Sequence, residues 1–351
     1  MIRNSRFLGG SAAAGRMALA AALISGAATA AAAASAEEPS FKGKQVTLLV
    51  GSTAGGGYDT FTRTIAPHFR RHLPGQPNVV VQNMPGAGSV VLANHLYNIA
   101  PKDGTAIGNV NPQIVIEPLM RPGRVKYDPT KMAWIGSALR ETHVSIAWYT
   151  TPIKSFDDLF QHELLVAGTG GATDTFPMFV NGLLGTKFKI IDGYPGMKEG
   201  MLAMERGEVH GNGGITWASA KATIGEWLAQ KKVRVFVQYG LVKHPELPDV
   251  PWIYDYAKTA DDRAAMNMVF ARQEYGRPYV APPGLTPATV ETLRRAFDAT
   301  MKDPEFLADA EKRKLDIDPI TGGQVQAIIA DLFKTPPAVV ERVKTILGDK
   351  G

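Results

Sequence analysis

Short apolar runs rich in β-branched residues alternate with helical patterns through most of the chain, and this alternation limits the possible folds more than any other feature. Such runs predict buried strands over Gln45–Val50, Asn78–Gln82, Thr105–Val110, Leu164–Ala167, Lys187–Ile191 and Val233–Val237. Between them, apolar residues recur on one helix face, for example at Phe61, Ile65 and Phe69. Repeated strand–helix–strand units indicate an α/β fold with mainly parallel sheets flanked by helices.

From Thr286 onward only helical spacing is found. One helix is predicted to open at Thr286-Pro287, another carries Val325, Ile329 and Leu332, and a last one opens at Thr335-Pro336. Such a tail is expected to pack onto a finished sheet. The length of 351 residues suggests two domains, and the absence of a low-complexity linker predicts that they are joined by tight crossings.

The first 36 residues have the three regions of a secretory signal peptide. Arg3, Arg6 and Arg16 are basic, an apolar run follows over Met17–Ile24, and Ala34-Ser35-Ala36 fits a small-x-small cleavage site. A membrane anchor is the alternative, but the apolar run is too short for a span of about 20 residues. We therefore expect export by the general secretory route, cleavage near Ala36 and a product that is soluble outside the inner membrane.

Composition and charge exclude several classes of protein. The chain has no cysteine, which excludes disulfide scaffolds, thiol nucleophiles, iron–sulfur clusters and cysteine-ligated zinc. The leader carries three Arg and no acidic residue, so its removal lowers the formal charge from +5 to +2. No basic run remains to neutralise phosphates, and the sequence gives no support to nucleic-acid binding.

Three glycine-rich loops each follow a predicted strand and precede a predicted helix. The first glycine loop is Val50–Asp59, the second is Asn83–Ser89 and the third is Gly168–Thr175. Glycines expose backbone N–H groups, and the N-terminus of the following helix adds a partial positive charge, so each loop can hold an anion. The alternative for the first loop is a tight turn that needs positive φ. For the second it is a helix cap, because Ser89 can either cap the helix or bind a carboxylate oxygen.

Motifs for catalysis, nucleotides and metals are missing. Neither G-x-G-x-x-G nor G-x-x-x-x-G-K-[ST] is present in the loops, and no G-x-S-x-G nucleophile turn occurs. His68 and His72 stand four residues apart, but they lack the Glu of H-E-x-x-H and predict a solvated basic face. We expect no catalytic residue, no metal and no cofactor.

Six stretches of the chain resemble, in order, motifs of the periplasmic receptors of tripartite tricarboxylate transporters, the Bug receptors. They are Val50–Asp59 for V-P-[FY]-x-x-G-G-x-x-D, Asn83–Ser89 for N-R-P-G-A-G-G, Ala100–Thr105 for A-x-P-D-G-Y-T, Tyr194–Gly196 with Gly207–His210 for Y-x-G and G-E-V-D, Leu247–Pro251 for L-P-D-V-P, and Ala281–Pro287 for A-P-x-G-T-P. The resemblance spans nearly the whole chain after the leader.

This resemblance implies a two-lobed periplasmic binding protein of type II, which closes like a Venus flytrap. Residues 37–141 would form the first part of lobe 1, residues 142–256 lobe 2, and residues 257–351 the second part of lobe 1 with the C-terminal helices. In the family, ligand carboxylates are held by backbone N–H groups, hydroxyls and water from the first two loops, and the second lobe closes over them.

The resemblance carries the ligand-binding role to individual positions of this chain. They are Ser52, Thr53, Gly56, Asp59, Gly88 and Ser89 in lobe 1 and Thr173, Tyr194 and Gly196 in lobe 2. Tyr58, which lies between Gly56 and Asp59, is added as a candidate contact in this chain. Three positions depart from the family pattern: Ser52 replaces an aromatic residue, Tyr58 a small residue and His210 an aspartate. These departures bear on which acid fits, because Tyr58 could fill space or stack on an aromatic ligand.

The implied function is that of a monomeric, non-enzymatic receptor that delivers a small organic carboxylate to the permease subunits of a tripartite tricarboxylate transporter. A receptor that feeds a signalling system would have the same ligand site and a different partner. A secreted hydrolase or lyase acting on carboxylated substrates is the other alternative, for which the chain offers no nucleophile, base or metal site.

Overall fold

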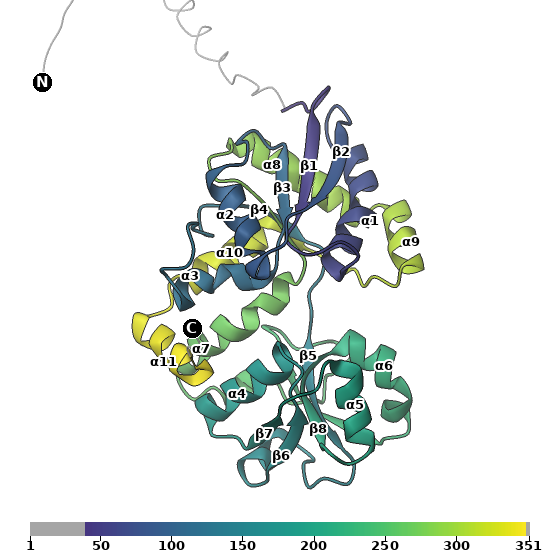
Figure 1. Cartoon of the computed structure of the whole chain (residues 1–351), viewed down its shortest axis with the longest axis vertical. Helices are drawn as coiled ribbons and strands as arrows, with labels where there is room; N and C mark the ends of the chain where they lie inside the picture. Colours follow the sequence, from purple (N-terminus) through teal and green to yellow (C-terminus); the bar gives the residue numbers. More distant parts are fainter. Residues whose placement is uncertain (1–38, 349–351) are drawn as a thin grey trace, which may run out of the picture. The chain divides into compact units, whose positions relative to one another are not determined.

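The computed structural model describes residues 39–348, which form two β-sheets flanked by helices (Figure 1). The predicted signal peptide lies outside the described residues. In the described part of the chain, no helix combines the length and apolar character that a bilayer span requires.

The first sheet has the strand order β11-β4-β10-β3-β1-β2. Its strands are β1 (Gln45–Val50), β2 (Asn78–Asn83), β3 (Ala106–Asn109), β4 (Ala133–Ser137), β10 (Pro278–Ala281) and β11 (Ile320–Thr321). The second sheet has the order β7-β6-β8-β5-β9. It contains β5 (His143–Trp148), β6 (Leu164–Ala167), β7 (Phe188–Ile191), β8 (Gly211–Thr216) and β9 (Val233–Tyr239).

Helices connect and cover these strands. They are α1 (Gly57–His72), α2 (Val90–Asn98), α3 (Glu117–Met120), α4 (Ala172–Leu184), α5 (Met197–Glu205), α6 (Trp217–Ala229), α7 (Ala260–Phe270), α8 (Pro287–Met301), α9 (Pro304–Lys312), α10 (Gly322–Leu332) and α11 (Pro337–Leu347). Thr286 caps α8 as its sequence suggested, since its side chain accepts a hydrogen bond from the N–H of Thr289.

The α/β prediction is confirmed, but both sheets are mixed rather than mainly parallel. Strands joined through helices are parallel, namely β2 and β3 to β1, and β7 and β8 to β6. The antiparallel strands include β5, the first strand of the second sheet, and β10, which returns to the first sheet. Neither is reached through a βαβ crossover, which is the connection that makes neighbours parallel. The tail also contains β11, so the expectation of helix alone after Thr286 was wrong.

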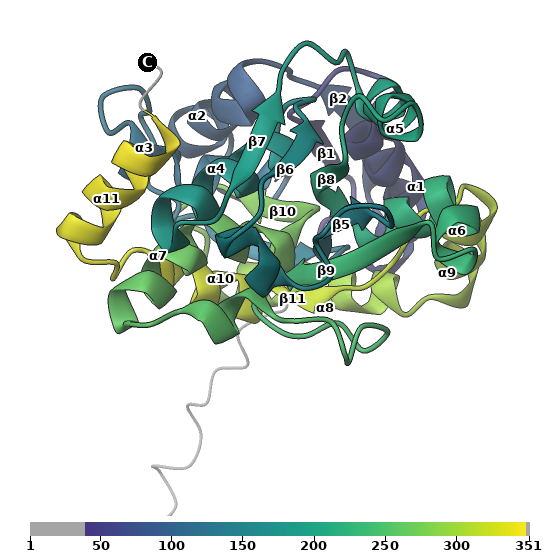
Figure 2. The ribbon, with the colours of Figure 1, turned by 90° about the horizontal axis from the view of Figure 1, so that it is seen from below.

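Each sheet has a hydrophobic core on both faces. In β1 the neighbours Leu48 and Leu49 point to opposite cores, one shared with α1 and α8 and the other with α2 and α10. Figure 2 shows α4, α7 and α11 on one side of the second sheet and α5 and α6 on the other. Consistent with this view, Phe270 of α7 and Val343 of α11 belong to a core cluster of the second sheet.

Candidate functional site

The glycine loops lie at the carboxyl ends of parallel strands. The first and second loops follow the adjacent strands β1 and β2, and the third follows β6, next to β7. In open α/β sheets, ligands bind at this edge. The fold thus brings the first two loops together on one sheet and places the third loop beside the β7–α5 connection, which contains Tyr194 and Gly196, on the other.

Asp59 holds the first glycine loop in shape. Its buried carboxylate accepts hydrogen bonds from the N–H of Gly55 at 2.8 Å, from Nε of Arg63 at 3.0 Å and from Nδ2 of Asn83 at 2.9 Å. Chiefly through the Arg63 bond, these contacts lower the pKa of Asp59 from 3.8 to about 2. Because the carboxylate is occupied by the protein itself, Asp59 acts on loop geometry and offers no direct contact to an anion.

The start of helix α1 presents backbone donors beside this loop. The N–H groups of Gly57, Tyr58 and Asp59 have no hydrogen-bond acceptor among the described residues, since the first turn of a helix lacks internal partners and Gly56 supplies no side-chain cap. Ser52 and Gly56 are half-buried and Thr53 is exposed on the same loop. Helix α1 has 16 residues, so its N-terminus carries the partial positive charge of a full helix dipole.

Low pH should lower the free energy of unfolding through protonation of Asp59. A carboxylate whose pKa is lowered from 3.8 to about 2 in the folded state contributes about 2 kcal/mol of stability, present above pH 4 and lost as the pH falls through 2. We expect urea unfolding of the unaltered protein to lose this increment between pH 5 and pH 2, and Asp59→Asn to lack it over that interval. Identical pH profiles for the two proteins would contradict this role of Asp59.

The second glycine loop has an unusual backbone, because four successive residues from Gly86 to Ser89 have positive φ. Ala87 and Ser89 have side chains, so their left-handed conformations are held against steric cost, about 1–3 kcal/mol each. The buried hydroxyl of Ser89 donates to the carbonyl of Gly51 and accepts from the N–H of Asn111, both at 3.0 Å. These contacts join the second loop to the first loop and to the segment after β3.

One of the two roles predicted for Ser89 is ruled out. Its side chain makes no capping hydrogen bond to α2, so the capping alternative was wrong. Its hydroxyl already has a donor and an acceptor within the protein, and direct contact of Ser89 with a ligand stays a prediction. Gly88 of the same loop is exposed with a φ of 61°, and a side chain there would meet no atom within 4 Å.

The third glycine loop is organised in the same way as the first. The carboxylate of Asp174 accepts hydrogen bonds from the N–H groups of Thr169 at 3.1 Å and Gly170 at 3.0 Å. The buried hydroxyl of Thr173 donates to the carbonyl of Gly170 at 3.0 Å, so it too is used inside the loop. The N–H groups of Ala172 and Thr173 begin α4 and have no acceptor among the described residues.

The β7–α5 connection contributes Tyr194 and Gly196. Gly196 is the N-cap of α5 and adds no side-chain cap, and Tyr194 is half-buried against the core beneath α5 and α6. His210, which replaces an aspartate of the family pattern, is half-buried. Its backbone N–H donates a hydrogen bond to the carbonyl of Leu165 at 2.8 Å and so extends the pairing of the sheet.

Two cavities touch the loops, and Gln113 lines both. One, of about 310 Å³, includes Gly171 and Thr175 of the third loop. The other, of about 490 Å³, includes Ala87 and Gly88 of the second loop. Neither is lined by residues of all three loops, so a single cleft bounded by every predicted site residue stays a prediction.

Sequence reasoning missed the arginines beside Tyr58. The guanidinium carbon of Arg277 lies 4.5 Å from the centre of the Tyr58 ring, and Nη1 of Arg277 lies 3.2 Å from Oε1 of Glu141. Burial raises the pKa of Tyr58 to about 12, although the charges of Arg277 and Arg272 act in the opposite direction. The Tyr58 ring therefore packs against the guanidinium of Arg277 at the end of the first loop. No local motif marks either arginine in the sequence.

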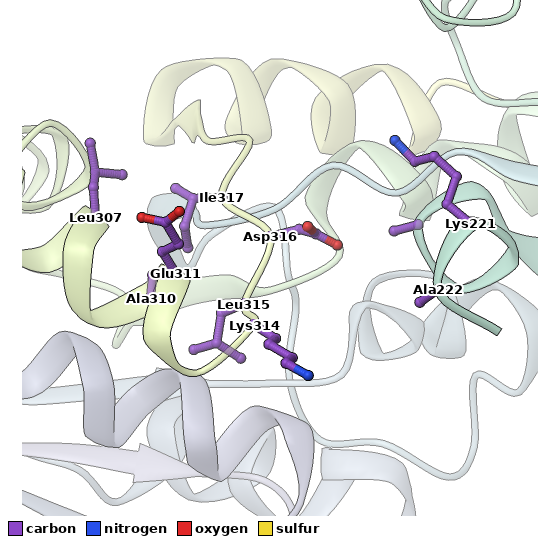
Figure 3. Close-up of a pocket in the computed structure, with 10 residues that line it drawn as sticks. Lys221, Ala222, Leu307, Ala310, Glu311, Lys314, Leu315, Asp316 and Ile317 are labelled. Carbon is purple, nitrogen blue, oxygen red and sulfur yellow. The ribbon is translucent and has the colours of Figure 1, made fainter. Parts of the chain in front are cut away.

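Another cavity, of about 610 Å³, lies away from the loops (Figure 3). Figure 3 shows Lys221 and Ala222 of α6 on one side and the segment from α9 to Ile317 on the other. None of the predicted site residues lines it. Lys221 is held by Glu246, with the shorter of two contacts at 2.7 Å.

The described residues contain no group of three His, Asp or Glu side chains placed to hold a metal ion. The predicted solvated basic face on α1 is wrong for His68, which is buried and bonded to Oδ2 of Asp309 at 3.0 Å. His72 likewise meets Asp303 at 3.0 Å. These contacts attach α9 to α1.

Comparison with known proteins identifies the family. The model of the tripartite tricarboxylate transporter family receptor matches residues 61–345. The chain is 26% identical over 317 residues to the UPF0065 protein in the gbd 5' region of Cupriavidus necator, covering 88% of this chain and 90% of that protein.

Solved structures share the fold. A TctC solute-binding protein from Polaromonas has a TM-score of 0.67 at 18% identity, covering 85% of this chain and 98% of that one. Rpa4515 of Rhodopseudomonas palustris with adipate has a TM-score of 0.54 at 18% identity, covering 87% of this chain and 97% of that one. MatC of the same species with bound malate has a TM-score of 0.53 at 17% identity, covering 84% of this chain and 98% of that one. The family prediction is confirmed, and the chain belongs to the tripartite tricarboxylate transporter receptor family.

Proposed function

We propose that this protein is an extracytoplasmic receptor that binds a small organic carboxylate through backbone N–H groups and delivers it to the permease of a tripartite tricarboxylate transporter. The observation that carries the proposal is the pair of helix starts, at Gly57–Asp59 of α1 and Ala172–Thr173 of α4, with amide donors that lack acceptors among the described residues. Such amides and the helix dipole favour an anion. Family membership and the dicarboxylates named with MatC and Rpa4515 support the same ligand class.

The proposed site has contacts to the ligand and residues that position them. Gly56, Tyr58, Gly88, Ser52 and Thr53 border the amides of lobe 1, and Gly196 and Tyr194 border those of lobe 2. Asp59, Ser89 and Thr173 hold the loops, since their polar atoms are bonded within the protein.

We further propose the lobe division expected from the sequence, with residues 37–141 and 257–351 in lobe 1 and residues 142–256 in lobe 2, except for two helices of the last segment. Helices α7 and α11 would move with lobe 2 despite their place in the chain, because Phe270 and Val343 pack in its core. Ligand binding favours a closed arrangement if both lobes contact the ligand. The mature protein would begin near Glu37, act as a monomer in the periplasm and leave its ligand chemically unchanged.

Thermal-shift measurements on residues 37–351 test the ligand class. Adipate, malate, citrate and benzoate are compared with adipamide, which keeps the size of adipate and loses both charges. A carboxylate at 100 times its Kd should add about 2.7 kcal/mol and raise Tm by several degrees, whereas adipamide should not. The proposal would be contradicted if adipamide stabilised the protein as much as adipate does. It would also be contradicted if none of the acids raised Tm.

Proton NMR of the bound acid and periplasmic cross-linking separate the remaining alternatives. An acid recovered unchanged after incubation supports a receptor, while turnover would indicate a hydrolase or lyase. Cross-linking to a permease subunit supports transport, and cross-linking to a sensor kinase would favour the signalling alternative.

A further inference from the structure

Arg272 is a cation placed between elements of the two sheets. It lies in the 3-10 helix η5 (Ala271–Tyr275), directly after α7. Its Nη1 donates a 2.7 Å hydrogen bond to Oε1 of Gln113, which follows β3 of the first sheet. Its guanidinium carbon lies 5.6 Å from the ring centre of Phe176 in α4, on the second sheet. Arg272 thus contacts elements that belong to both sheets.

Arg272 also lines the 310 Å³ cavity of the third glycine loop, together with Gly171 and Thr175. Two further cations line this cavity, but each has an acidic partner: Arg121 lies 3.0 Å from Glu117, and Lys344 lies 2.7 Å from Glu341. No described carboxylate lies within 4.0 Å of the Arg272 guanidinium, and no acidic residue is among those that line the cavity.

The surroundings of Arg272 disfavour its charge, which the carboxylate of Glu141, more than 4.0 Å away, compensates only in part. The side chain is half-buried, and burial is the main cause that lowers its pKa. A guanidinium has five N–H donors, and Gln113 accepts from only one nitrogen. A carboxylate can accept two parallel hydrogen bonds from an arginine, which both satisfies these donors and neutralises the charge.

Arg272 is also linked to the second glycine loop. Its partner Gln113 lines the 490 Å³ cavity of that loop, and its charge acts on the phenol of Tyr58 in the first loop. A ligand held by the loop amides at one end can therefore extend toward Arg272 at the other.

We propose that Arg272 binds a second carboxylate of the ligand, so that the receptor selects dicarboxylates over monocarboxylates of the same length. This inference rests on the proposed function, in which the loop amides hold the first carboxylate. Arg272 supplies the charge recognition that the amides alone lack.

The test uses isothermal titration of the mature protein with adipate, monomethyl adipate and hexanoate. These probes have the same six-carbon acyl chain and differ at the far end, which is an acid, an ester or a methyl group. The unaltered protein should bind adipate at least about 30-fold more tightly than the other two, which is about 2 kcal/mol. In Arg272→Gln this preference should disappear, with the affinity for hexanoate changed by less than about 3-fold.

Matched variants separate recognition from folding. Lys344→Gln removes a cation of the same cavity that already has an acidic partner, and it should keep the preference for adipate. Arg272→Lys keeps the charge without the paired donors and should keep part of the preference for adipate. This variant tests the role of residue 272 even if Arg272→Gln folds poorly.

The outcomes separate the two proposals. Hexanoate and adipate bound equally well by the unaltered protein, or an adipate preference that survives in Arg272→Gln, would overturn the role of Arg272 and leave the receptor function intact. Failure of every acid to bind the unaltered protein would instead overturn the proposed function.

Discussion

Gly51→Ala should destabilise the protein by about 3 kcal/mol and weaken carboxylate binding at least 10-fold, because overpacking a buried site of this kind is costly. A Cβ at residue 51 would lie 2.2 Å from Oγ of Ser89 and 2.6 Å from its Cβ. The Ser89 side chain would have to move and release its hydrogen bonds to Gly51 and Asn111. Those bonds join the first two glycine loops, so both stability and binding should fall.

A double-mutant cycle identifies the cause. Ser89→Gly removes the overlapping atoms, and glycine adopts the φ of 75° at this position without strain. The combination Gly51→Ala/Ser89→Gly should therefore be more stable than the sum of the two single changes predicts, by at least about 1 kcal/mol in urea unfolding. Strict additivity would mean that the contact between residues 51 and 89 does not hold the loops together.

Gly214→Ala should have a comparable effect on the other sheet, about 3 kcal/mol, because the obstacle there is backbone and cannot rotate away. A Cβ at residue 214 of β8 would lie 2.5 Å from the carbonyl oxygen of Ala172 and 2.7 Å from its carbonyl carbon. Ala172 begins α4, so the substitution pushes the helix start, with its amide donors, away from the sheet. Adipate affinity should fall together with the free energy of unfolding.

Gly225→Ala is the matched control, since a Cβ at that position in α6 would meet no atom within 4 Å. Alanine is the better helix former by about 1 kcal/mol, so this variant should be as stable as the unaltered protein or more so and should bind adipate equally well. A Gly214→Ala protein with unchanged unfolding and binding would show that β8 does not fix the position of α4.

The sequence predicted six of the eleven described strands, β1, β2, β3, β6, β7 and β9, and missed β4, β5, β8, β10 and β11. Gln45–Val50 and Leu164–Ala167 agree with β1 and β6 at both ends. By contrast, β8 was missed because its sequence, GNGGIT, has low β-propensity. Its glycines are explained by tertiary packing, since α4 lies too close to β8 for side chains at residues 213 and 214. Propensity cannot reveal such an approach between segments far apart in the chain.

The candidate site was predictable to a similar degree. Strand, glycine loop and helix in succession indicated where amide donors would gather, and the structure places them at the starts of α1 and α4. The roles of individual polar side chains were less accessible. Ser89 and Asp59 look like ligand contacts in a motif, but the folded chain occupies both with internal hydrogen bonds. No motif marks Arg272 in the sequence. Its surroundings are formed by η5, by the segment after β3 and by α4, which are far apart in the chain.

Amide chemical shifts during an adipate titration test the binding mode most directly. In 15N–1H spectra of the mature protein, binding through backbone donors should move the amide protons of Gly57, Tyr58 and Ala172 downfield in a saturable manner, with little change at Gly225. Saturable binding of adipate that leaves those three amide signals in place would contradict the recognition of a carboxylate by the helix starts.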